Sequence, residues 1–302
     1  MKTLIIKLNA TGDVVRTSTL LRRLPGSVVW VTAANNVPLL EGVAPHLTCT
    51  SWENRSIALN HEYDLVINLE DEKEVSAFLP SVRYKRLFGA HLGDDGEVKY
   101  TDDAKAWFDM SLVSVYGRQR ADELKLLNRR SYQDLIFEGL GFRFQGEPYV
   151  LPRVRASELS GDVAMAPVAG AVWPMKNWAY YDLLKERLEA EGLKVNVLPK
   201  RPTLLAHLAD VAGHRCLVGG DSLPMHLALG SDISCVTLFN CTSPWEIYDY
   251  GLMTKIVSPL LEQFYYKRGM DERATKAISV EQVFDAVVER LVDARRGGAS
   301  VA

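Results

Sequence analysis

Short apolar runs alternate with segments of helical periodicity in the first half of the chain. The runs are bounded by polar residues, as is typical of buried strands in a parallel sheet. The predicted strands are residues 3–8, 28–32 and 63–69, and the predicted helices are residues 14–24, 37–42 and 122–139. Residues 82–100 are rich in glycine and charge and are predicted to be a loop, and residues 140–152 a connector. Strands that alternate with helices predict a doubly wound α/β domain.

The same alternation restarts in the second half. The predicted strands are residues 163–167, 193–198, 216–218 and 235–239, and the predicted helices are residues 178–191, 204–211, 222–230 and 279–292. Residues 152–162 between the halves are polar and have no strong period. We therefore predict two domains, residues 1–155 and 156–302. Their architectures are similar, although no repeat is detectable in the sequence.

Composition narrows the class of protein. The chain has 302 residues, 47% of them hydrophobic and 24% charged, with a net charge of −3 and a pI near 6.1. These values do not indicate a nucleic-acid partner. No apolar run approaches the ~18 residues of a membrane span, and the first apolar run is too short for a signal peptide. We therefore expect a cytoplasmic protein. Cys216 and Cys235 lie in apolar runs without CxxC spacing, so we expect buried free thiols and no zinc site.

The stretch from Cys216 to Leu229 is the strongest candidate for a ligand site. An apolar strand leads to Gly219-Gly220-Asp221-Ser222, and a predicted helix containing His226 follows. Glycines at such a turn let a ligand approach the backbone closely. The N-terminus of the helix offers free N–H groups and the positive end of the helix dipole, which suit a phosphate or diphosphate. The alternative is a strand–turn–helix that is capped by Ser222 and binds nothing.

Two other polar residues are expected at carboxyl ends of strands, where ligands bind in open α/β sheets. Asp13 follows the first strand, and Lys176 lies in the loop 169–177. Asp13 could instead cap its helix, Lys176 could be a solvated surface lysine, and a helical histidine such as His226 is more often packed or solvated than functional. We interpret the carboxylates of residues 70–74 as solvated charges and not as a metal-binding group.

Several common enzyme signatures are missing from the sequence. It contains no GxGxxG, GxxxxGK[ST], GxSxG or HExxH motif. A dinucleotide-dependent dehydrogenase, a P-loop nucleotidase, an α/β-hydrolase and a zinc protease of the corresponding types are therefore not expected.

Four stretches, in this order, resemble the bacterial heptosyltransferases of glycosyltransferase family 9. They are LIIKLNATGDVVRTSTLLRRL, WPMKNW, LVGGDSLPMHLAL and LFNCTSPWEIYDYG. The resemblance spans nearly the whole chain, and AISVEQVFDAVVERL is similar to the last helix of the family. It implies a GT-B fold, in which two Rossmann-like domains face an interdomain cleft. The N-terminal domain would then serve the acceptor and the C-terminal domain the nucleotide sugar.

The resemblance also implies an activity and residue roles. The family transfers heptose with inversion from a nucleotide-diphosphate sugar such as ADP-heptose, without a metal, in lipopolysaccharide biosynthesis. By this likeness Asp13 is the general base and Lys176 a phosphate contact. Around the diphosphate and the sugar lie the remaining donor-binding residues, which are Gly219, Gly220, Asp221, Ser222 and His226. No cofactor is expected beyond the donor substrate.

The sequence departs from the family at two places that matter for the donor. Ala171-Val172 stand where many members have hydroxyl residues, and Pro199-Lys200-Arg201 stand where an acidic residue often holds the ribose. The donor's nucleotide and sugar therefore stay open, as do the glycan or glycolipid acceptor, peripheral contact with the inner membrane and the oligomeric state. A non-catalytic GT-B assembly subunit and a nucleotide-sugar epimerase stay open as alternative functions.

Overall fold

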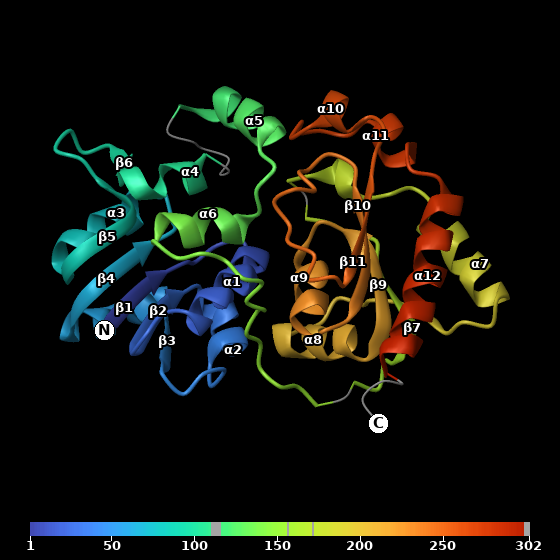
Figure 1. Ribbon diagram of the computed structural model, residues 1–302, viewed down its shortest axis with the longest axis horizontal. Coiled ribbons are helices and arrows are strands. Elements are labelled where there is room, and N and C mark those ends of the chain that lie inside the picture. The colour runs from blue at the N-terminus through green and yellow to red at the C-terminus, as the bar shows by residue number, and fades with distance from the viewer. Residues whose placement is uncertain (110–115, 156, 171, 299–302) are drawn as a thin grey trace. The chain divides into compact units, whose positions relative to one another are not determined.

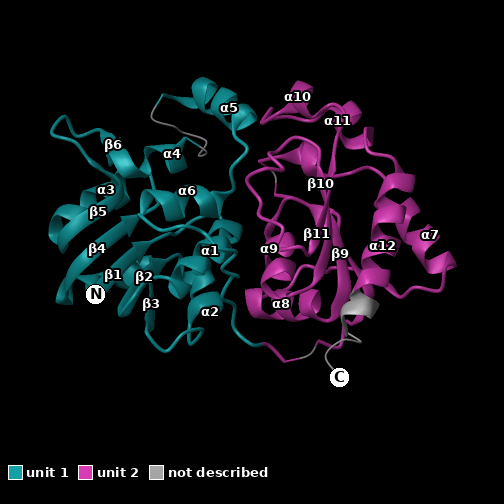
Figure 2. Cartoon of the chain, in the orientation of Figure 1, with its two compact units in different colours: residues 1–153 teal, residues 154–302 magenta. Residues whose placement is uncertain are grey.

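The computed structural model describes residues 1–109, 116–155, 157–170 and 172–298, the last five of these by their backbone alone. It divides into two compact units, Met1–Arg153 and Val154–Ala302 (Figure 2). The predicted boundary stood between residues 155 and 156. Each unit is built around its own sheet, so each is described separately.

Unit 1 is a six-stranded sheet in the order β3-β2-β1-β4-β5-β6 (Figure 1). Every pair of neighbouring strands is parallel except β5 and β6. The strands are β1 (Lys2–Ile6), β2 (Ser27–Thr32), β3 (Leu47–Ser51), β4 (Glu62–Asn68), β5 (Arg83–Leu92) and β6 (Val98–Tyr100). The helices are α1 (Thr11–Thr17), α2 (Val37–Leu40), α3 (Lys73–Phe78), α4 (Lys105–Phe108), α5 (Arg118–Leu127) and α6 (Tyr132–Gly139), and short 3-10 turns join several of them.

The central strands of unit 1 are apolar on both faces because each face packs into its own core. Leu4 of β1 belongs to one buried cluster, which includes Val66 of β4. The next residue, Ile5, belongs to the cluster on the other face and is level with Trp30 of β2. Alternate side chains point to opposite faces of a strand. A doubly covered parallel sheet therefore requires the continuous apolar run that predicted β1.

Unit 2 is a five-stranded, entirely parallel sheet in the order β11-β10-β9-β7-β8. Its strands are β7 (Gly161–Ala166), β8 (Val195–Val197), β9 (His214–Gly220), β10 (Ser234–Phe239) and β11 (Met253–Val257). Its helices are α7 (Tyr181–Ala190), α8 (Leu204–Ala212), α9 (Leu223–Gly230), α10 (Leu261–Phe264), α11 (Glu272–Lys276) and α12 (Val280–Gly298). Figure 1 shows α8 and α9 on one face of this sheet, and α7 and α12 on the other.

Each sheet contains one place where the direction of strand addition reverses. In unit 1 the chain goes from β1 outward to β2 and β3, then returns to the other side of β1 with β4. In unit 2 it goes from β7 to β8, then returns to the other side of β7 with β9. The loops after the two central strands diverge at such a point and leave a crevice that ligands use. The α/β class and the repeated architecture of the two halves are confirmed.

Two parts of the secondary-structure prediction are wrong. Residues 82–100 form the antiparallel pair β5–β6 instead of a loop. The predicted helix 122–139 is two helices, because Ser131 and Asp134 form a capping box that starts α6 afresh. The β5–β6 pair was missed because its sequence is rich in charged residues and glycine. The break between α5 and α6 was missed because the helical spacing of apolar residues continues across it. In the described part of the chain, no helix is long and apolar enough to cross a membrane.

Candidate functional site

The glycine pair of the candidate ligand site ends a strand of unit 2 and does not form the turn. Gly219 and Gly220 are the last residues of β9, so the connection to α9 is only Asp221 and Ser222. A Cβ on Gly219 would lie 3.2 Å from the Cβ of Ala166 on β7, and one on Gly220 would lie 3.1 Å from the carbonyl oxygen of Lys176. The glycines therefore admit neighbouring protein backbone. This close packing explains the two glycines without a ligand.

Lys176 and Asp221 form an ion pair across the switch point of unit 2. Lys176 ends a 3-10 turn, Pro174–Lys176, in the loop after β7, and Asp221 follows β9. The Lys176 Nζ donates to the Asp221 carbonyl oxygen at 2.6 Å and to its Oδ2 at 3.1 Å. The two side chains are 13% and 17% exposed. A largely buried ammonium that keeps some exposure beside a helix start suits binding of a diphosphate.

Ser222 holds the N-cap position of α9, but its side chain makes no capping bond. The hydroxyl donates instead to the carbonyl oxygen of Gly220 at 3.3 Å. Pro224 lies in the first turn, as predicted. Because the expected cap bond is not made, Ser222 does not occupy the first N–H groups of the helix, and an anion could use them. His226 is buried one turn further along.

Tyr266 lies close enough to Asp221 to feel its charge, and it brings an aromatic and an acidic side chain with it that were not predicted as site residues. The Tyr266 hydroxyl donates to Glu246 Oε1 at 3.1 Å, and Trp173 packs edge-on against the Tyr266 ring. Burial raises the pKa of Tyr266, and the carboxylates of Glu246 and Asp221 raise it further. Glu246 lies in the last of the four stretches with family likeness, which was the available signal. These contacts fix the surroundings of the pair.

Asp13 lies at the other switch point, in unit 1, inside the first turn of α1. The helix begins at Thr11, and Ala10 holds the N-cap position with a left-handed φ of 56°. Asp13 therefore does not cap the helix, because it is the third helical residue and the N-cap position belongs to Ala10. Asp13 Oδ1 pairs with Arg16 at 2.9 Å and its side chain is 31% exposed. A partly exposed carboxylate at the carboxyl end of β1 is within reach of a substrate hydroxyl.

Arg16 is itself held in place from the opposite side. Its guanidinium lies 3.9 Å above the centre of the Tyr132 ring, a cation–π contact. The hydroxyl of Tyr132 bonds to Thr17 Oγ1 at 2.6 Å. Burial raises the pKa of Tyr132, and the charge of Asp13 adds to that shift. Arg16 and Tyr132 therefore orient Asp13, a role that helical spacing in the sequence does not reveal.

Glu70 is buried, which contradicts its interpretation as a solvated charge. It is 4% exposed and follows β4, on the other side of the switch point from Asp13. Its Oε1 accepts from Lys7 Nζ at 2.8 Å and from the backbone amides of Leu8 and Asn9 at 2.6 and 3.0 Å. Burial raises the pKa of Glu70, while the Lys7 ammonium and the two amides lower it. Glu70 clamps the loop that carries the chain from β1 to α1.

The metal-ligating residue types do not cluster in the part of the chain that the structure describes. Among those residues, no group of three or more His, Cys, Asp or Glu side chains is placed to hold a metal ion. All four cysteines are free thiols, and Cys216, Cys235 and Cys241 are buried, which confirms the expectation for the first two.

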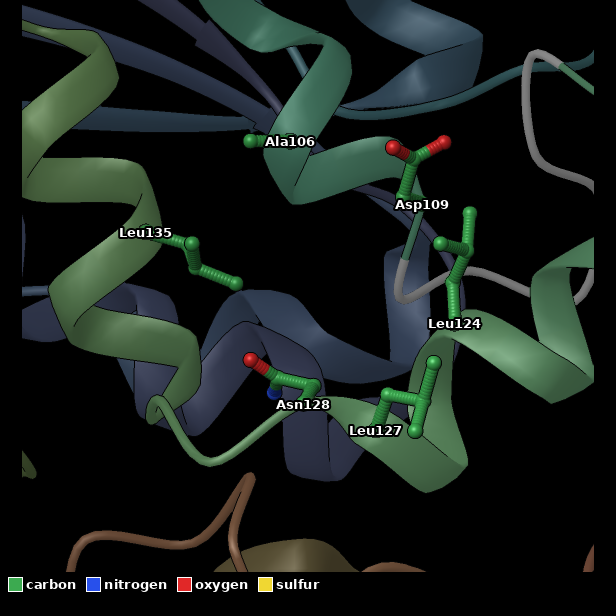
Figure 3. Close-up of a pocket in the computed structure, with 6 residues that line it drawn as sticks. All are labelled: Ala106, Asp109, Leu124, Leu127, Asn128 and Leu135. Carbon is green, nitrogen blue, oxygen red and sulfur yellow. The ribbon is translucent and has the colours of Figure 1, made fainter.

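A separate pocket of about 270 Å³ lies within unit 1. Figure 3 shows Leu135 projecting from α6 toward Leu124 and Leu127 of α5, and Ala106, Asp109 and Asn128 complete the labelled lining. Burial raises the pKa of Asp109. The lining that is described carries no cationic side chain, so this pocket does not suit a diphosphate.

The structure brings several of the predicted donor-side residues together within unit 2. Lys176 contacts Asp221, and the backbone of Gly220 lies beside that of Lys176. Gly219 and Ser222 flank Gly220-Asp221 in the chain, and His226 lies further along α9. Asp13 belongs to the other unit. Ala171 lies outside the described residues, while Arg201 is paired with Asp210 at 2.5 Å. Arg201, which stands where an acidic residue often holds the ribose in the family, is therefore already paired within unit 2.

The chain has the fold of solved glycosyltransferases. It is similar to a glycosyl transferase family 9 protein from Veillonella parvula DSM 2008, with 15% identity, 97% of each chain covered and a TM-score of 0.62. The E. coli heptosyltransferase WaaC, solved with ADP-2-deoxy-2-fluoro heptose, is 13% identical over 94% of this chain and 99% of its own, with a TM-score of 0.57.

An iron-containing dodecameric glycosyltransferase, TibC from enterotoxigenic E. coli H10407, is 11% identical over 97% of this chain and 78% of its own, with a TM-score of 0.56. No family model matches the sequence, and no curated protein does. At these identities the likeness establishes the fold alone, which is the predicted GT-B class with two Rossmann-like domains.

The contacts of Glu70 with Lys7 and the loop after β1 should contribute to the stability of unit 1. Glu70→Gln keeps an oxygen for the two backbone amides but leaves the buried Lys7 charge without a counterion. We expect the free energy of unfolding to fall by about 2–3 kcal/mol, measured by urea denaturation. The double variant Lys7→Met/Glu70→Gln should recover part of the loss, because no charge then stays buried. Equal stability of Glu70→Gln and the parent chain would show that the pair does not hold the loop.

Proposed function

We propose that this protein is an inverting glycosyltransferase that uses a nucleotide-diphosphate sugar. The observation that carries the proposal is the Lys176–Asp221 pair at the switch point of unit 2, beside the N-terminus of α9. A switch point in a parallel sheet is where nucleotides bind, and a lysine beside a helix start provides positive charge for a diphosphate. The fold shared with solved heptosyltransferases supports the same assignment.

The leaving group determines what unit 2 must supply. When the sugar–phosphate bond breaks, negative charge grows on the departing nucleoside diphosphate. Lys176 and the first N–H groups of α9 would stabilise this charge without reorganising. Asp221 would position the Lys176 ammonium and accept from a hydroxyl of the sugar. Metal-independent transfer is part of this proposal, since a lysine and a helix N-terminus take over the task of a divalent cation.

The acceptor needs a base on the side opposite the leaving group. Asp13 would take the proton from the acceptor hydroxyl as the hydroxyl oxygen attacks the anomeric carbon. The carbon–oxygen bond forms as the bond to the diphosphate breaks, so the anomeric configuration inverts. The mechanism requires the switch-point edges of the two units to bind the two substrates together during the reaction.

The donor is proposed to be ADP-heptose or a close analogue, and the acceptor a glycan or glycolipid. Support for the donor comes from the WaaC relative, whose solved complex contains an ADP-linked fluoro-heptose. A place at the cytoplasmic side of the membrane, in lipopolysaccharide biosynthesis, belongs to the same proposal.

One experiment separates this function from the two alternatives. Purified protein is incubated with a panel of nucleotide sugars, with and without a mixture of glycan acceptors. Nucleotide release that depends on acceptor supports transfer. Interconversion of sugars without acceptor would indicate an epimerase. Tight donor binding without turnover under any condition would indicate an assembly subunit that keeps the fold.

Lys176→Ala should weaken donor binding and slow transfer by roughly 10²–10³-fold, because it removes a cation from the developing charge. Binding of ADP by calorimetry and transfer rates measure the two effects. Lys185→Ala is the matched control, since Lys185 is a surface lysine paired with Glu189 on α7. A folded Lys176→Ala protein with parental kinetics would remove Lys176 from the site.

Transfer should be unaffected by EDTA. In this proposal the described cationic groups of unit 2 perform the charge stabilisation, so chelation removes nothing that the reaction needs. Initial transfer rates are measured with and without roughly 10 mM EDTA, an excess that removes a weakly bound divalent ion. Activity that disappears with chelator and returns with added Mg²⁺, Mn²⁺ or Fe²⁺ would replace the lysine mechanism with a metal-assisted one.

Asp13→Asn tests the base. It keeps the shape of the side chain but cannot take up a proton, so turnover should fall by roughly 10²–10⁴-fold. Loss of the partly buried pair with Arg16 and of the favourable first-turn charge should lower stability by about 1 kcal/mol. Donor affinity should stay at the parental value because unit 2 binds the donor. Asp13→Ala removes the same charge and, in addition, the side-chain oxygen that contacts Arg16. Near-normal turnover by the Asn variant contradicts a catalytic role.

A further inference from the structure

The turn Asn240–Ser243 lies at the same edge of the unit 2 sheet as the Lys176–Asp221 pair. It follows β10, whose Leu238 is level with Gly220 of β9. Burial raises the pKa of Cys241 to about 11, and the charges of Lys176 and Asp221 act on the same thiol in opposite directions. The turn belongs to a stretch that the sequence analysis singled out and to which no role has yet been given.

Three backbone anchors hold this turn in place. Asn240 Nδ2 donates to the carbonyl oxygen of Met175 at 3.0 Å, and the Tyr266 amide donates to the carbonyl oxygen of Cys241 at 2.8 Å. The Lys255 Nζ, from β11, donates to the carbonyl oxygen of Pro244 at 2.8 Å. Burial lowers the pKa of Lys255. A turn fixed at both ends and in the middle presents its side chains in a defined arrangement.

Three side-chain oxygens of the turn are buried without a hydrogen-bond partner among the described residues. They are Asn240 Oδ1, Thr242 Oγ1 and Ser243 Oγ. The residues are 0%, 1% and 1% exposed, so solvent does not replace the missing partners, and a ligand reaches the three oxygens only when the side chains that cover the turn move aside. Buried polar atoms are almost always hydrogen-bonded, and an unpaired one lowers stability. Three on one anchored turn, next to a proposed diphosphate site, indicate a ligand that completes them.

The orientation of Asn240 identifies the chemistry of that ligand. Its amide nitrogen faces the Met175 carbonyl, which only accepts hydrogen bonds, so the assignment of Oδ1 and Nδ2 is fixed by the partner. Oδ1 therefore requires a donor. A phosphate oxygen cannot donate at neutral pH, whereas a sugar hydroxyl can both donate and accept. Thr242 and Ser243 carry hydroxyls of the same dual character.

We propose that the Asn240–Ser243 turn binds hydroxyl groups of the donor's sugar, while Lys176 and the start of α9 bind its diphosphate. The inference rests on the proposed function and deepens it, because it assigns recognition of the sugar to residues outside the diphosphate site. The turn sets which sugar is transferred through the hydrogen bonds that Asn240, Thr242 and Ser243 make with it.

The test compares each nucleoside diphosphate with its sugar conjugate, starting with ADP and ADP-heptose, by calorimetry. Thr242→Val and Ser243→Ala should each weaken binding of ADP-heptose by about 5- to 10-fold, the effect of one hydrogen bond. Binding of ADP should change less than twofold, roughly the precision of such comparisons. The melting temperature of the free protein should stay the same or rise, because each change removes an unsatisfied buried hydroxyl.

Thr3→Val is the matched control. Thr3 is fully buried on β1 of unit 1, and its hydroxyl likewise has no partner among the described residues. It lies toward the amino end of its strand, away from the edge that carries Asp13. Its melting temperature should behave like that of Thr242→Val, while the affinities for both ADP and ADP-heptose stay parental.

Two results would overturn the inference alone. In the first, Thr242→Val and Ser243→Ala bind ADP-heptose as tightly as the parent chain does, while Lys176→Ala still weakens the binding of ADP. The other is a lower melting temperature in both variants with unchanged affinities, because the hydroxyls would then hold an internal water molecule. A parent chain that binds no nucleoside diphosphate and no conjugate in the panel contradicts the proposed function, and this inference with it.

Discussion

The reversal of strand order in each sheet is the constraint on which the rest of the structure depends. It leaves two loops side by side at the carboxyl edge, and each unit bridges them with a lysine–carboxylate pair. In unit 1 Lys7 after β1 meets Glu70 after β4, and in unit 2 Lys176 after β7 meets Asp221 after β9. The divergent loops would otherwise splay, because no strand hydrogen bonds connect them beyond the sheet.

The two pairs differ in burial, and the difference assigns them different tasks. The Lys7 and Glu70 side chains are 6% and 5% exposed, and the Glu70 carboxylate also accepts two backbone amides, so this pair is structural. The side chains of the second pair are 13% and 17% exposed, and the pair lies beside a short turn and the start of α9. A charge that keeps some contact with solvent still interacts strongly with an incoming anion, and it can exchange its partner at lower cost.

The sequence predicted the parts of this arrangement that depend on local pattern. Continuous apolar runs placed β1, β4 and β7, because strands covered on both faces must be apolar throughout. β5 was missed because its first half is largely exposed and pairs with β4 alone, and charged residues are tolerated at such an open edge. Residue roles that depend on long-range contact were out of reach. The burial of Glu70 requires Lys7, 63 positions away, and Gly220 is explained only by the backbone of Lys176.

Buried polar groups without hydrogen-bond partners distinguish the Asn240–Ser243 turn of unit 2 from the Glu70 clamp of unit 1. The Glu70 clamp draws three donors from within the chain to a single carboxylate oxygen, so it contributes to stability. The Asn240–Ser243 turn is anchored just as firmly, yet its side-chain oxygens lack partners among the described residues. Such groups lower the stability of the free chain. They lie at the same sheet edge as Lys176, so in the proposed site a polyhydroxylated ligand would supply their missing hydrogen bonds while the lysine meets an anion.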